Sequence, residues 1–246
     1  MLEGQVLKAE IMKISTSTLA VLAIASTSLF AVPVTAADTA AAGKSGEPHW
    51  NCRSHPGGEW PIDPAEYVVR NCAFCHEPGL QGYALAPRLA GQHRDYIIVQ
   101  LERFRTKERN NPFSLKFMSH VSVNVQQDSY CAVGAYISTM VPEARRDGDE
   151  ALLGKGEDIF RHGAPNDNIP ACQFCHGPEA QGLGIFPRLG GQSYYYLKRR
   201  LEQWGQGLGA ISPHMPGIAS KLNADQVEAV ASYLSFLPAA PSKGEF

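Results

Sequence analysis

Apolar side chains recur at helical spacing in four segments of the chain, which are residues 92–105, 128–139, 192–204 and 224–236. Such spacing gives each segment one face that can be buried against a core. Glycine (23 residues) and proline (17 residues) are moderately enriched, which favours short helices joined by long loops. The pattern therefore predicts an all-α fold rich in loops.

The ends of two helices are marked by polar residues and prolines. Asn223 and Asp128 are the expected N-caps of the segments 224–236 and 128–139. Pro142 and Pro238 follow these two segments, and the residue before a proline disfavours helical geometry.

An internal repeat organises the chain. Several short motifs recur at an offset of 100 residues, among them Gln81-Gly82, Pro87-Arg88-Leu89, Gly91-Gln92 and Leu101-Glu102. Farther along, Met118 matches Met215 and Tyr136 matches Tyr233 at an offset of 97. One length change of three residues between residues 103 and 118 accounts for the difference, and we expect it in a loop.

The repeat predicts two domains of similar size. The expected division is a signal peptide (1–36), an N-terminal extension (37–63), a first domain (64–141), a linker (142–150), a second domain (151–240) and a tail (241–246). Two short helical segments, 64–73 and 151–161, open the domains. The linker is predicted because its sequence is short, charged and poor in apolar residues.

The N-terminal stretch has the features of a leader. An apolar run follows Lys13, and Val34-Thr35-Ala36 offers small residues for a signal peptidase. Translation from Met12 would give the better leader, since the residues before it include two glutamates. We expect export to the periplasm with cleavage near Ala36. An uncleaved membrane anchor is the alternative.

Charge excludes one class of partner. The 246 residues carry a formal net charge of −2, so there is no overall basic field of the kind that binds nucleic acid. A local basic run, which consists of Arg103, Arg105, Lys107 and Arg109, has two interpretations. It either steers an acidic partner or forms a solvated helix end.

Four of the six cysteines lie in two C-x-x-C-H motifs. The copies are Cys72-Ala-Phe-Cys75-His76 and Cys172-Gln-Phe-Cys175-His176. In this motif the two thiols reach the vinyl groups of one haem, and the histidine that follows becomes the proximal iron ligand. The sequence therefore predicts two covalently attached haem c groups, with His76 and His176 on the irons. A zinc site would need cysteine pairs that converge on one metal, whereas these pairs lie in separate repeats.

Each repeat also offers a sixth ligand. Met118 and Met215 hold equivalent positions, each 18 residues before the tyrosine of the final helix. Thioether ligands favour ferrous iron. For the first site His120 remains an alternative to Met118, because it lies two residues away. Met140 follows a helix and is expected in ordinary packing.

Together these motifs resemble the diheme cytochrome c4 family of class I cytochromes c. The resemblance covers residues 64–240 and is most specific at Phe186-Pro187-Arg188-Leu189-Gly190-Gly191-Gln192 and at Met215 followed by Leu222-x-x-Asp225-Gln226. It implies two tandem class I cytochrome c domains, each with a few helices around one haem and with His/Met ligation. It further implies that the carbonyls of Pro87 and Pro187 orient the proximal histidines.

The family also suggests a role for two arginines. By resemblance Arg88 and Arg188 meet haem propionates; the alternative is that both are solvated surface charges. Two cysteines, Cys52 and Cys131, are left over. In class I cytochromes the final helix packs near the entry helix that Cys52 precedes, which suggests a disulfide, and two unrelated thiols are the alternative.

The first repeat departs from the family pattern. Val121 to Gln127 replaces the usual helix entry, His93 follows Gly91-Gln92, and an additional segment, 48–61, precedes the domain. Within that segment Trp50, Trp60 and Cys52 either cover the first domain or form a docking surface. These differences affect the expected partner more than the cofactor.

The resemblance implies a periplasmic electron carrier between a dehydrogenase or quinol-oxidising cytochrome complex and an acceptor such as a terminal oxidase. Association with a membrane would then be peripheral, through such partners. Two alternatives stay open. One is a haem enzyme, such as a diheme peroxidase or a thiosulfate dehydrogenase, in which Cys131 could be a thiolate ligand. The other is a cytochrome subunit bound permanently to a dehydrogenase.

Overall fold

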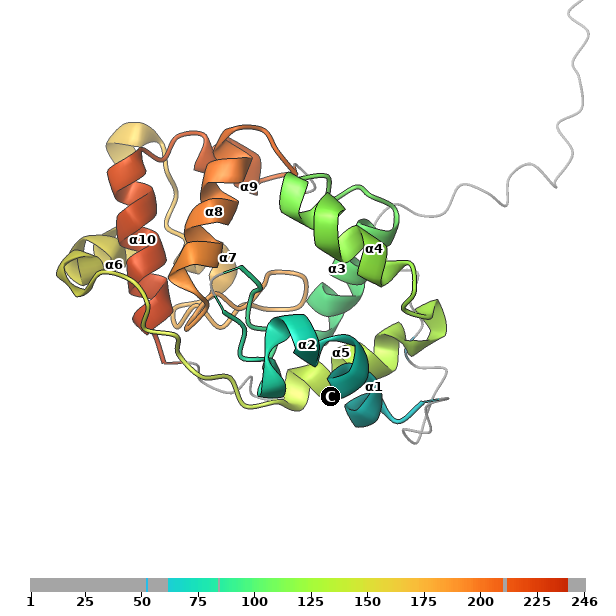
Figure 1. Cartoon of the computed structure of the whole chain (residues 1–246). Coiled ribbons are helices and arrows are strands. Elements are labelled where there is room, and N and C mark those ends of the chain that lie inside the picture. The colour runs from blue at the N-terminus through green and yellow to red at the C-terminus, as the bar shows by residue number, and fades with distance from the viewer. Residues whose placement is uncertain (1–51, 53–61, 84, 210–211, 239–246) are drawn as a thin grey trace, which may run out of the picture. The chain divides into compact units, whose positions relative to one another are not determined.

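The structure is a computed structural model that describes residues 52, 62–83, 85–209 and 212–238. The predicted leader, most of the N-terminal extension with Trp50 and Trp60, and the C-terminal tail lie outside the described residues. Within the described ranges the chain is helical, and its β-structure is limited to two isolated bridges, Ala164 with Ile169 and Leu183 with Phe186. The all-α prediction is confirmed (Figure 1).

The first half contains five α-helices and a π-helical turn. They are α1 (Pro64–Asn71), α2 (Ala73–His76), α3 (Arg94–Arg105), η3 (Ser114–Met118), α4 (Ser119–Ser122) and α5 (Tyr130–Thr139). Asp63 caps α1, since its side chain accepts hydrogen bonds from the backbone amides of Ala65 and Glu66. Helix α5 packs against α3 and α1 (Figure 1).

The second half repeats this order. It contains α6 (Leu153–His162), α7 (Gln173–His176), α8 (Tyr194–Gly205), α9 (Met215–Ala219) and α10 (Ala224–Phe236). Helix α10 packs against α6 and α8 (Figure 1). Short 3-10 turns complete both halves at Pro78–Leu80, Gln127–Ser129, Glu150–Leu152 and Pro165–Asp167.

The expected helix caps have different outcomes. Asn223 caps α10 through a capping box with Gln226, as predicted. The prediction for Asp128 is wrong, because the chain enters α5 through the 3-10 turn Gln127–Ser129. Ser129 is then the N-cap residue, and its side chain makes no capping hydrogen bond.

Each half has its own hydrophobic clusters. The second half has one cluster that includes Phe160, Leu197, Val230 and Leu234. The first half has two, one that includes Val68, Ile97 and Ile137 and one with Ile98, Val125, Tyr130 and Cys131. Met140 packs against the first of these, as expected for an ordinary apolar contact.

The segment between the halves is fastened to the second half. Asp147 accepts hydrogen bonds from the Ser193 hydroxyl (3.0 Å) and the Tyr194 amide (2.8 Å). The backbone amide of Arg146 donates to the carbonyl of Ser235 at 2.9 Å. These contacts anchor 142–150 although its sequence is charged and poor in apolar residues. The division into two domains at this segment stays a prediction.

Candidate haem sites

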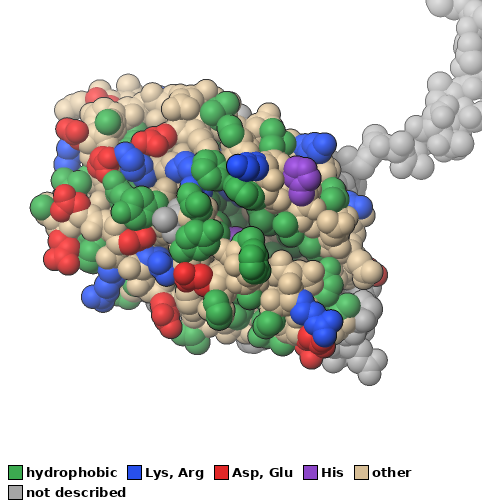
Figure 2. Space-filling view, viewed as in Figure 1, with side chains coloured by type: hydrophobic (Ala, Val, Ile, Leu, Met, Phe, Trp, Pro, Cys, Tyr) green, Lys and Arg blue, Asp and Glu red, His purple; other side chains and the backbone are tan. Residues whose placement is uncertain are grey.

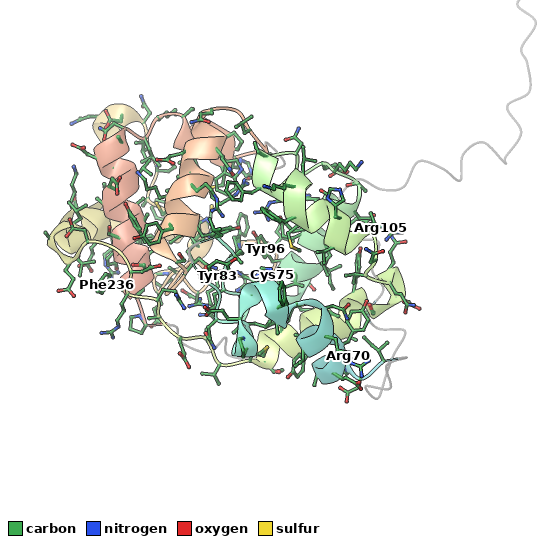
Figure 3. All side chains as sticks on the ribbon, viewed as in Figure 1. Arg70, Cys75, Tyr83, Tyr96, Arg105 and Phe236 are labelled. Atoms are coloured by element: carbon green, nitrogen blue, oxygen red, sulfur yellow. A yellow bond between two sulfur atoms is a disulfide. The ribbon has the colours of Figure 1, made fainter. Side chains whose placement is uncertain are left out.

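The two C-x-x-C-H motifs fold into matching short helices. In α2 the amide of His76 donates to the carbonyl of Cys72 at 3.0 Å, and α7 repeats this contact between His176 and Cys172 at 3.0 Å. One helical turn therefore presents both thiols of a motif beside its histidine. All four thiols are free, and the second of each motif, Cys75 or Cys175, is exposed. Figure 3 shows Cys75 on α2.

Both histidines are buried and held through one ring nitrogen. His76 Nδ1 lies 2.8 Å from the carbonyl oxygen of Pro87, and His176 Nδ1 lies 3.0 Å from that of Pro187. A carbonyl can only accept, so Nδ1 carries the proton and Nε2 keeps a lone pair. Burial lowers the pKa of both imidazoles, partly offset by the carbonyl contact. Each histidine is thus a neutral ring with Nε2 free to bind a metal.

Glycine places the carbonyl that orients each histidine. The amide of Gly82 donates to the carbonyl of His76 at 2.8 Å, with a φ of +71° that favours glycine. A Cβ at this position would lie 2.5 Å from the carbonyl carbon of Pro87. The same approach occurs in the second half, where a Cβ on Gly182 would lie 2.6 Å from the carbonyl carbon of Pro187. The repeated Gln-Gly pair therefore serves the histidine-binding loop.

Burial also affects the first thiol of each motif. It raises the pKa of Cys72 to about 11, with a smaller contribution from Cys75, and raises the pKa of Cys172 to about 11. Both thiols are thus protonated at neutral pH.

The candidate sixth ligands occupy similar settings. Met118 ends the π-helical turn η3 and is half-buried. Met215 begins α9, is half-buried, and packs against the core cluster of the second half. The alternative ligand His120 is exposed on α4. Burial favours the methionine over the histidine in the first half.

Arg88 and Arg188 are not surface charges, since each is only 2 % exposed. Arg88 donates to the carbonyl of Glu143 at 2.7 Å and to that of Gly190 at 2.6 Å. Burial lowers the pKa of Arg88 to about 10, and the nearby positive charge of Arg188 adds to the effect. Among the described residues, Arg88 Nε is buried without a hydrogen-bond partner. A cationic donor in this setting suits a carboxylate.

The residues around these arginines bind across the two halves. The Gln192 side chain accepts from the Arg88 amide at 2.8 Å and donates to the Arg88 carbonyl at 2.9 Å. Gln92 makes the matching pair with the backbone of Arg188, at 2.8 and 3.1 Å. His93 adds a contact of 2.7 Å between its Nε2 and the carbonyl of Gln181. The P-R-L-x-G-Q box thus joins the halves.

Sequence reasoning missed a second buried cluster. Arg109 is 6 % exposed, which excludes a solvated helix end at this residue. Its guanidinium donates to Gln100 of its own half at 2.8 Å and to the Tyr196 hydroxyl of the other half at 2.9 Å. Burial and the charge of Arg109 lower the pKa of Arg200 to about 10. Tyr96, labelled in Figure 3, repeats as Tyr196, and that repetition was the available signal.

The surface around the motifs is apolar. Phe74 and Phe174, inside the two motifs, are 95 % and 80 % exposed, and Leu85 and Leu183 are also exposed. Figure 2 shows hydrophobic side chains gathered over the middle of one face. Exposed apolar groups of this extent indicate a surface that binds another apolar group. With paired thiols and an imidazole whose Nε2 is free to bind a metal, each half fits a haem, and the first half adds the buried Arg88 Nε.

The leftover cysteines form a disulfide. The Cα atoms of Cys52 and Cys131 lie 5.5 Å apart, and their sulfur atoms are bonded. The predicted disulfide is confirmed, and Cys131 is therefore no thiolate ligand. Cys52 packs against the first half, but the tryptophans expected beside it lie outside the described residues.

No helix in the described part of the chain combines the length and the apolar character that a membrane span needs.

Comparisons with known proteins show similarity to cytochromes. The family model described as cytochrome C oxidase, cbb3-type, subunit III matches residues 153–234. Cytochrome c4 of Thiocapsa roseopersicina is 36% identical over 174 residues, which cover 68% of this chain and 86% of that protein. A thiosulfate dehydrogenase electron acceptor of Stutzerimonas stutzeri is 38% identical over 171 residues, which cover 67% of this chain and 77% of that one.

A solved structure shows the same architecture. Cytochrome c4 of Acidithiobacillus ferrooxidans superposes with a TM-score of 0.64 at 33% identity, and the match covers 68% of this chain and 98% of that chain.

Proposed function

Because this chain belongs to the diheme cytochrome c4 family, we propose that it carries electrons in the periplasm between a dehydrogenase or quinol-oxidising complex and an acceptor such as a terminal oxidase. Its family establishes the coarser statements: a tandem pair of class I cytochrome c domains, two covalently bound haem c groups and a role as a diheme electron carrier. The residues that hold the haems, the compartment and the partners are the proposal.

We assign the first haem to Cys72, Cys75 and His76 and the second haem to Cys172, Cys175 and His176. The supporting observation is the repeated contact between histidine Nδ1 and a proline carbonyl, which leaves Nε2 for iron in both halves. When bound, each haem supplies a reversible one-electron Fe(III)/Fe(II) couple. The carbonyl contact fixes the tautomer of the ring, so oxidation and reduction need no movement of the proximal ligand.

Met118 and Met215 are the proposed sixth ligands. Both are half-buried, whereas His120 is exposed. A thioether in an apolar setting stabilises ferrous iron, so both reduction potentials should be positive. If a histidine and a methionine of the chain hold each iron, neither iron would keep an open position for peroxide or thiosulfate, which favours transfer of electrons over haem-based catalysis.

The buried arginines are proposed to receive the carboxylates of the haem. Arg88 Nε has no hydrogen-bond partner among the described residues. Burial lowers the pKa of Arg88, and the positive charge of Arg188 nearby lowers it further. Glu179 is an anionic neighbour of Arg188, whereas the charges that act on Arg88 are those of Arg188 and Arg145, and a buried cation beside other cations is costly. A haem carboxylate beside Arg88 would offset that cost.

A dehydrogenase is the electron donor that the relatives favour. One relative is named as the electron acceptor of a thiosulfate dehydrogenase, and a second, from Thiomonas intermedia, has the same name. This chain carries no net basic charge for nucleic acid, and we propose redox proteins as its partners, through which any membrane association occurs.

Export is part of the proposal. Haem attachment to C-x-x-C-H motifs takes place outside the cytoplasm, and the disulfide between Cys52 and Cys131 suits an oxidising compartment. N-terminal sequencing of the mature protein should start near Asp38, after cleavage following Ala36 or Ala37. A mature chain that starts at Met1 or Met12 would support the membrane anchor instead.

The function is tested by counting electrons and turnover. In a coulometric titration the purified protein should accept two electrons per chain and return them to an acceptor protein. Added alone to peroxide or thiosulfate, it should show no turnover, whereas Met215→Ala, which opens one iron, should gain peroxidase activity. Sustained wild-type turnover of peroxide or thiosulfate without another protein would establish a haem enzyme and overturn the proposal.

A further inference from the structure

The two halves secure the same position of their final helix in different ways. Cys131 in α5 matches Glu228 in α10 at the offset of 97 that also relates Tyr136 to Tyr233. Glu228 accepts hydrogen bonds from Lys198 and Tyr194 of α8. Lys198 is therefore the partner that ties α10 to α8 through an ion pair.

In the first half this ion pair is replaced by a covalent link. The residue that matches Lys198 is Ile98, which is 2 % exposed and belongs to one apolar cluster with Cys131. Neither Cys131 nor Ile98 carries a charge, so these two positions cannot form an ion pair. Cys131 forms a disulfide with Cys52 instead. The disulfide thus stands where the second half has its ionic contact.

The start of the final helix differs as well. Helix α10 begins with the capping box of Asn223 and Gln226, and the Gln226 side chain also donates to Asp167 at 2.8 Å. Helix α5 begins without a side-chain cap. Its second residue is Cys131, so the disulfide holds the end of α5 that lacks a cap.

The disulfide lies in the cluster that also holds the segment after Met118. Val121 and Val125 pack with Cys52 and Cys131 in this cluster, and Val125 is 5 % exposed. Val121 belongs to α4, which continues directly from the π-helical turn that ends at Met118. A rigid contact at Val121 therefore restrains the position of Met118 three residues earlier.

Few polar contacts hold the same segment. Arg105 Nη1 donates to the Val123 carbonyl at 3.2 Å, and the Gln126 amide donates to the Tyr67 hydroxyl at 3.4 Å. Both lie at exposed positions, and Arg105 Nη1 adds one partly buried contact of 3.5 Å to the carbonyl of Ser122. Apolar packing against the disulfide therefore restrains residues 119–125 together with the contact of α4 with α3.

We propose that the disulfide between Cys52 and Cys131 positions the axial-ligand segment of the first haem, and of that haem only. It does so by fixing the apolar cluster on which Val121 and Val125 rest, which keeps Met118 directed at the iron. This inference rests on the ligation of the first haem by His76 and Met118 under the proposed function.

The test compares two potentials within one molecule. In Cys52→Ala/Cys131→Ala the equilibrium constant for reduction of the first haem should fall at least tenfold, which is about 59 mV for a one-electron couple. The far-red methionine–iron band of that haem should weaken, while the second haem keeps its potential and band. The signals of the first haem are identified by their loss in Met118→Ala.

The matched control is Glu228→Gln, which breaks the corresponding tie in the second half and should leave the first haem unchanged. Unchanged band and potential at the first haem of the double variant would overturn the proposal, even if its thermal stability falls. An equal effect of Glu228→Gln on the first haem would also overturn it. If the double variant does not fold, wild-type protein is reduced with a phosphine, blocked with iodoacetamide, reoxidised and measured in the same way.

Failure of the underlying ligation would look different. If the wild-type protein shows no methionine–iron band at the first haem, the assignment of Met118 fails before the disulfide is altered.

Discussion

Gln92 and Gln192 make the same pair of hydrogen bonds to opposite halves of the chain. Gln92 bonds to the backbone amide and carbonyl of Arg188, and Gln192 bonds to those of Arg88. Both side chains are buried, at 6 % and 4 % exposed. A glutamine of each half thus provides hydrogen-bond partners for a backbone amide and carbonyl of the other half. These backbone groups belong to the residue that follows the proline whose carbonyl contacts a histidine.

Replacing one of these glutamines should weaken the whole protein. Gln192→Leu leaves the amide and carbonyl of Arg88 buried without partners, at a cost of about 1–3 kcal/mol for each group. We expect the free energy of unfolding to fall by about 2–4 kcal/mol, measured by urea unfolding. Gln206→Leu, at an exposed position near the end of α8, should change it by less than about 0.5 kcal/mol. Equal transition midpoints for the two variants would contradict this role.

The glycine that approaches Pro187 should be needed for the second haem. In Gly182→Ala the new Cβ would lie 2.4 Å from the Phe186 carbonyl oxygen, at a φ of +74°. The loop must move, which draws the Pro187 carbonyl away from His176. We expect less attached haem per chain and a lower potential at the second site, measured by the pyridine haemochrome assay and redox titration.

Gly154→Ala is the control for that variant, because a Cβ there meets nothing within 4 Å. It should leave haem content and potential at wild-type values. Normal haem content and potential in Gly182→Ala would show that the loop tolerates a side chain and that the glycine is not required.

The ion pair of Glu228 should make stability depend on pH. Its hydrogen bond with Lys198 lowers the pKa of Glu228 below the ordinary 4.5, so the pair stabilises the fold above that pH. The stabilisation is lost as the pH falls through the lowered pKa that Glu228 has in the folded protein. Because the two side chains are 30% and 33% exposed, Glu228→Gln should cost only about 1 kcal/mol at pH 7.

The measurement is urea unfolding of wild type and Glu228→Gln from pH 7 down to pH 3. The difference between them should stay constant near neutrality and shrink in the acid range. Asp225→Asn is the control, because its carboxylate is 85% exposed and 3.9 Å from Lys155, and it should have little effect at any pH. A difference that grows toward low pH would contradict the assigned sign.

Mass spectrometry should count the haems. After acid–acetone extraction, which removes haem that is not covalently bound, the wild-type chain should keep the mass of two haems. Cys172→Ala/Cys175→Ala should keep one, and Cys72→Ala/Cys75→Ala should keep the other. A wild-type mass equal to that of the bare polypeptide would refute covalent attachment at these cysteines.

The sequence was informative wherever an interaction repeats at constant spacing. The offset of 100 residues aligned the two motifs with the two prolines, and the structure places each Pro carbonyl on the corresponding histidine. The role of Asn223 as an N-cap could also be predicted, because a capping box involves only residues close in sequence. The disulfide could be proposed once the family suggested that the helices near Cys52 and Cys131 meet.

Contacts between the halves were beyond sequence reasoning. Arg88 and Arg188 could equally have been surface charges, because their burial depends on the backbone of residues about 100 positions away. Arg109 looked like part of a solvated basic run, yet its partner Tyr196 lies in the other half. Asp128 failed as a cap because the 3-10 turn at Gln127–Ser129 depends on how the chain returns to α5.

The far-red absorption of the ferric protein tests the proposed ligation most directly. Both irons should be low-spin and six-coordinate, with a methionine–iron charge-transfer band that weakens in Met118→Ala and again in Met215→Ala. His120→Ala should leave the band unchanged, because this histidine is exposed on α4. A first haem that is unaffected by Met118→Ala but opened by His120→Ala would be bis-histidine, and a high-spin resting iron at either site would contradict the electron-carrier account.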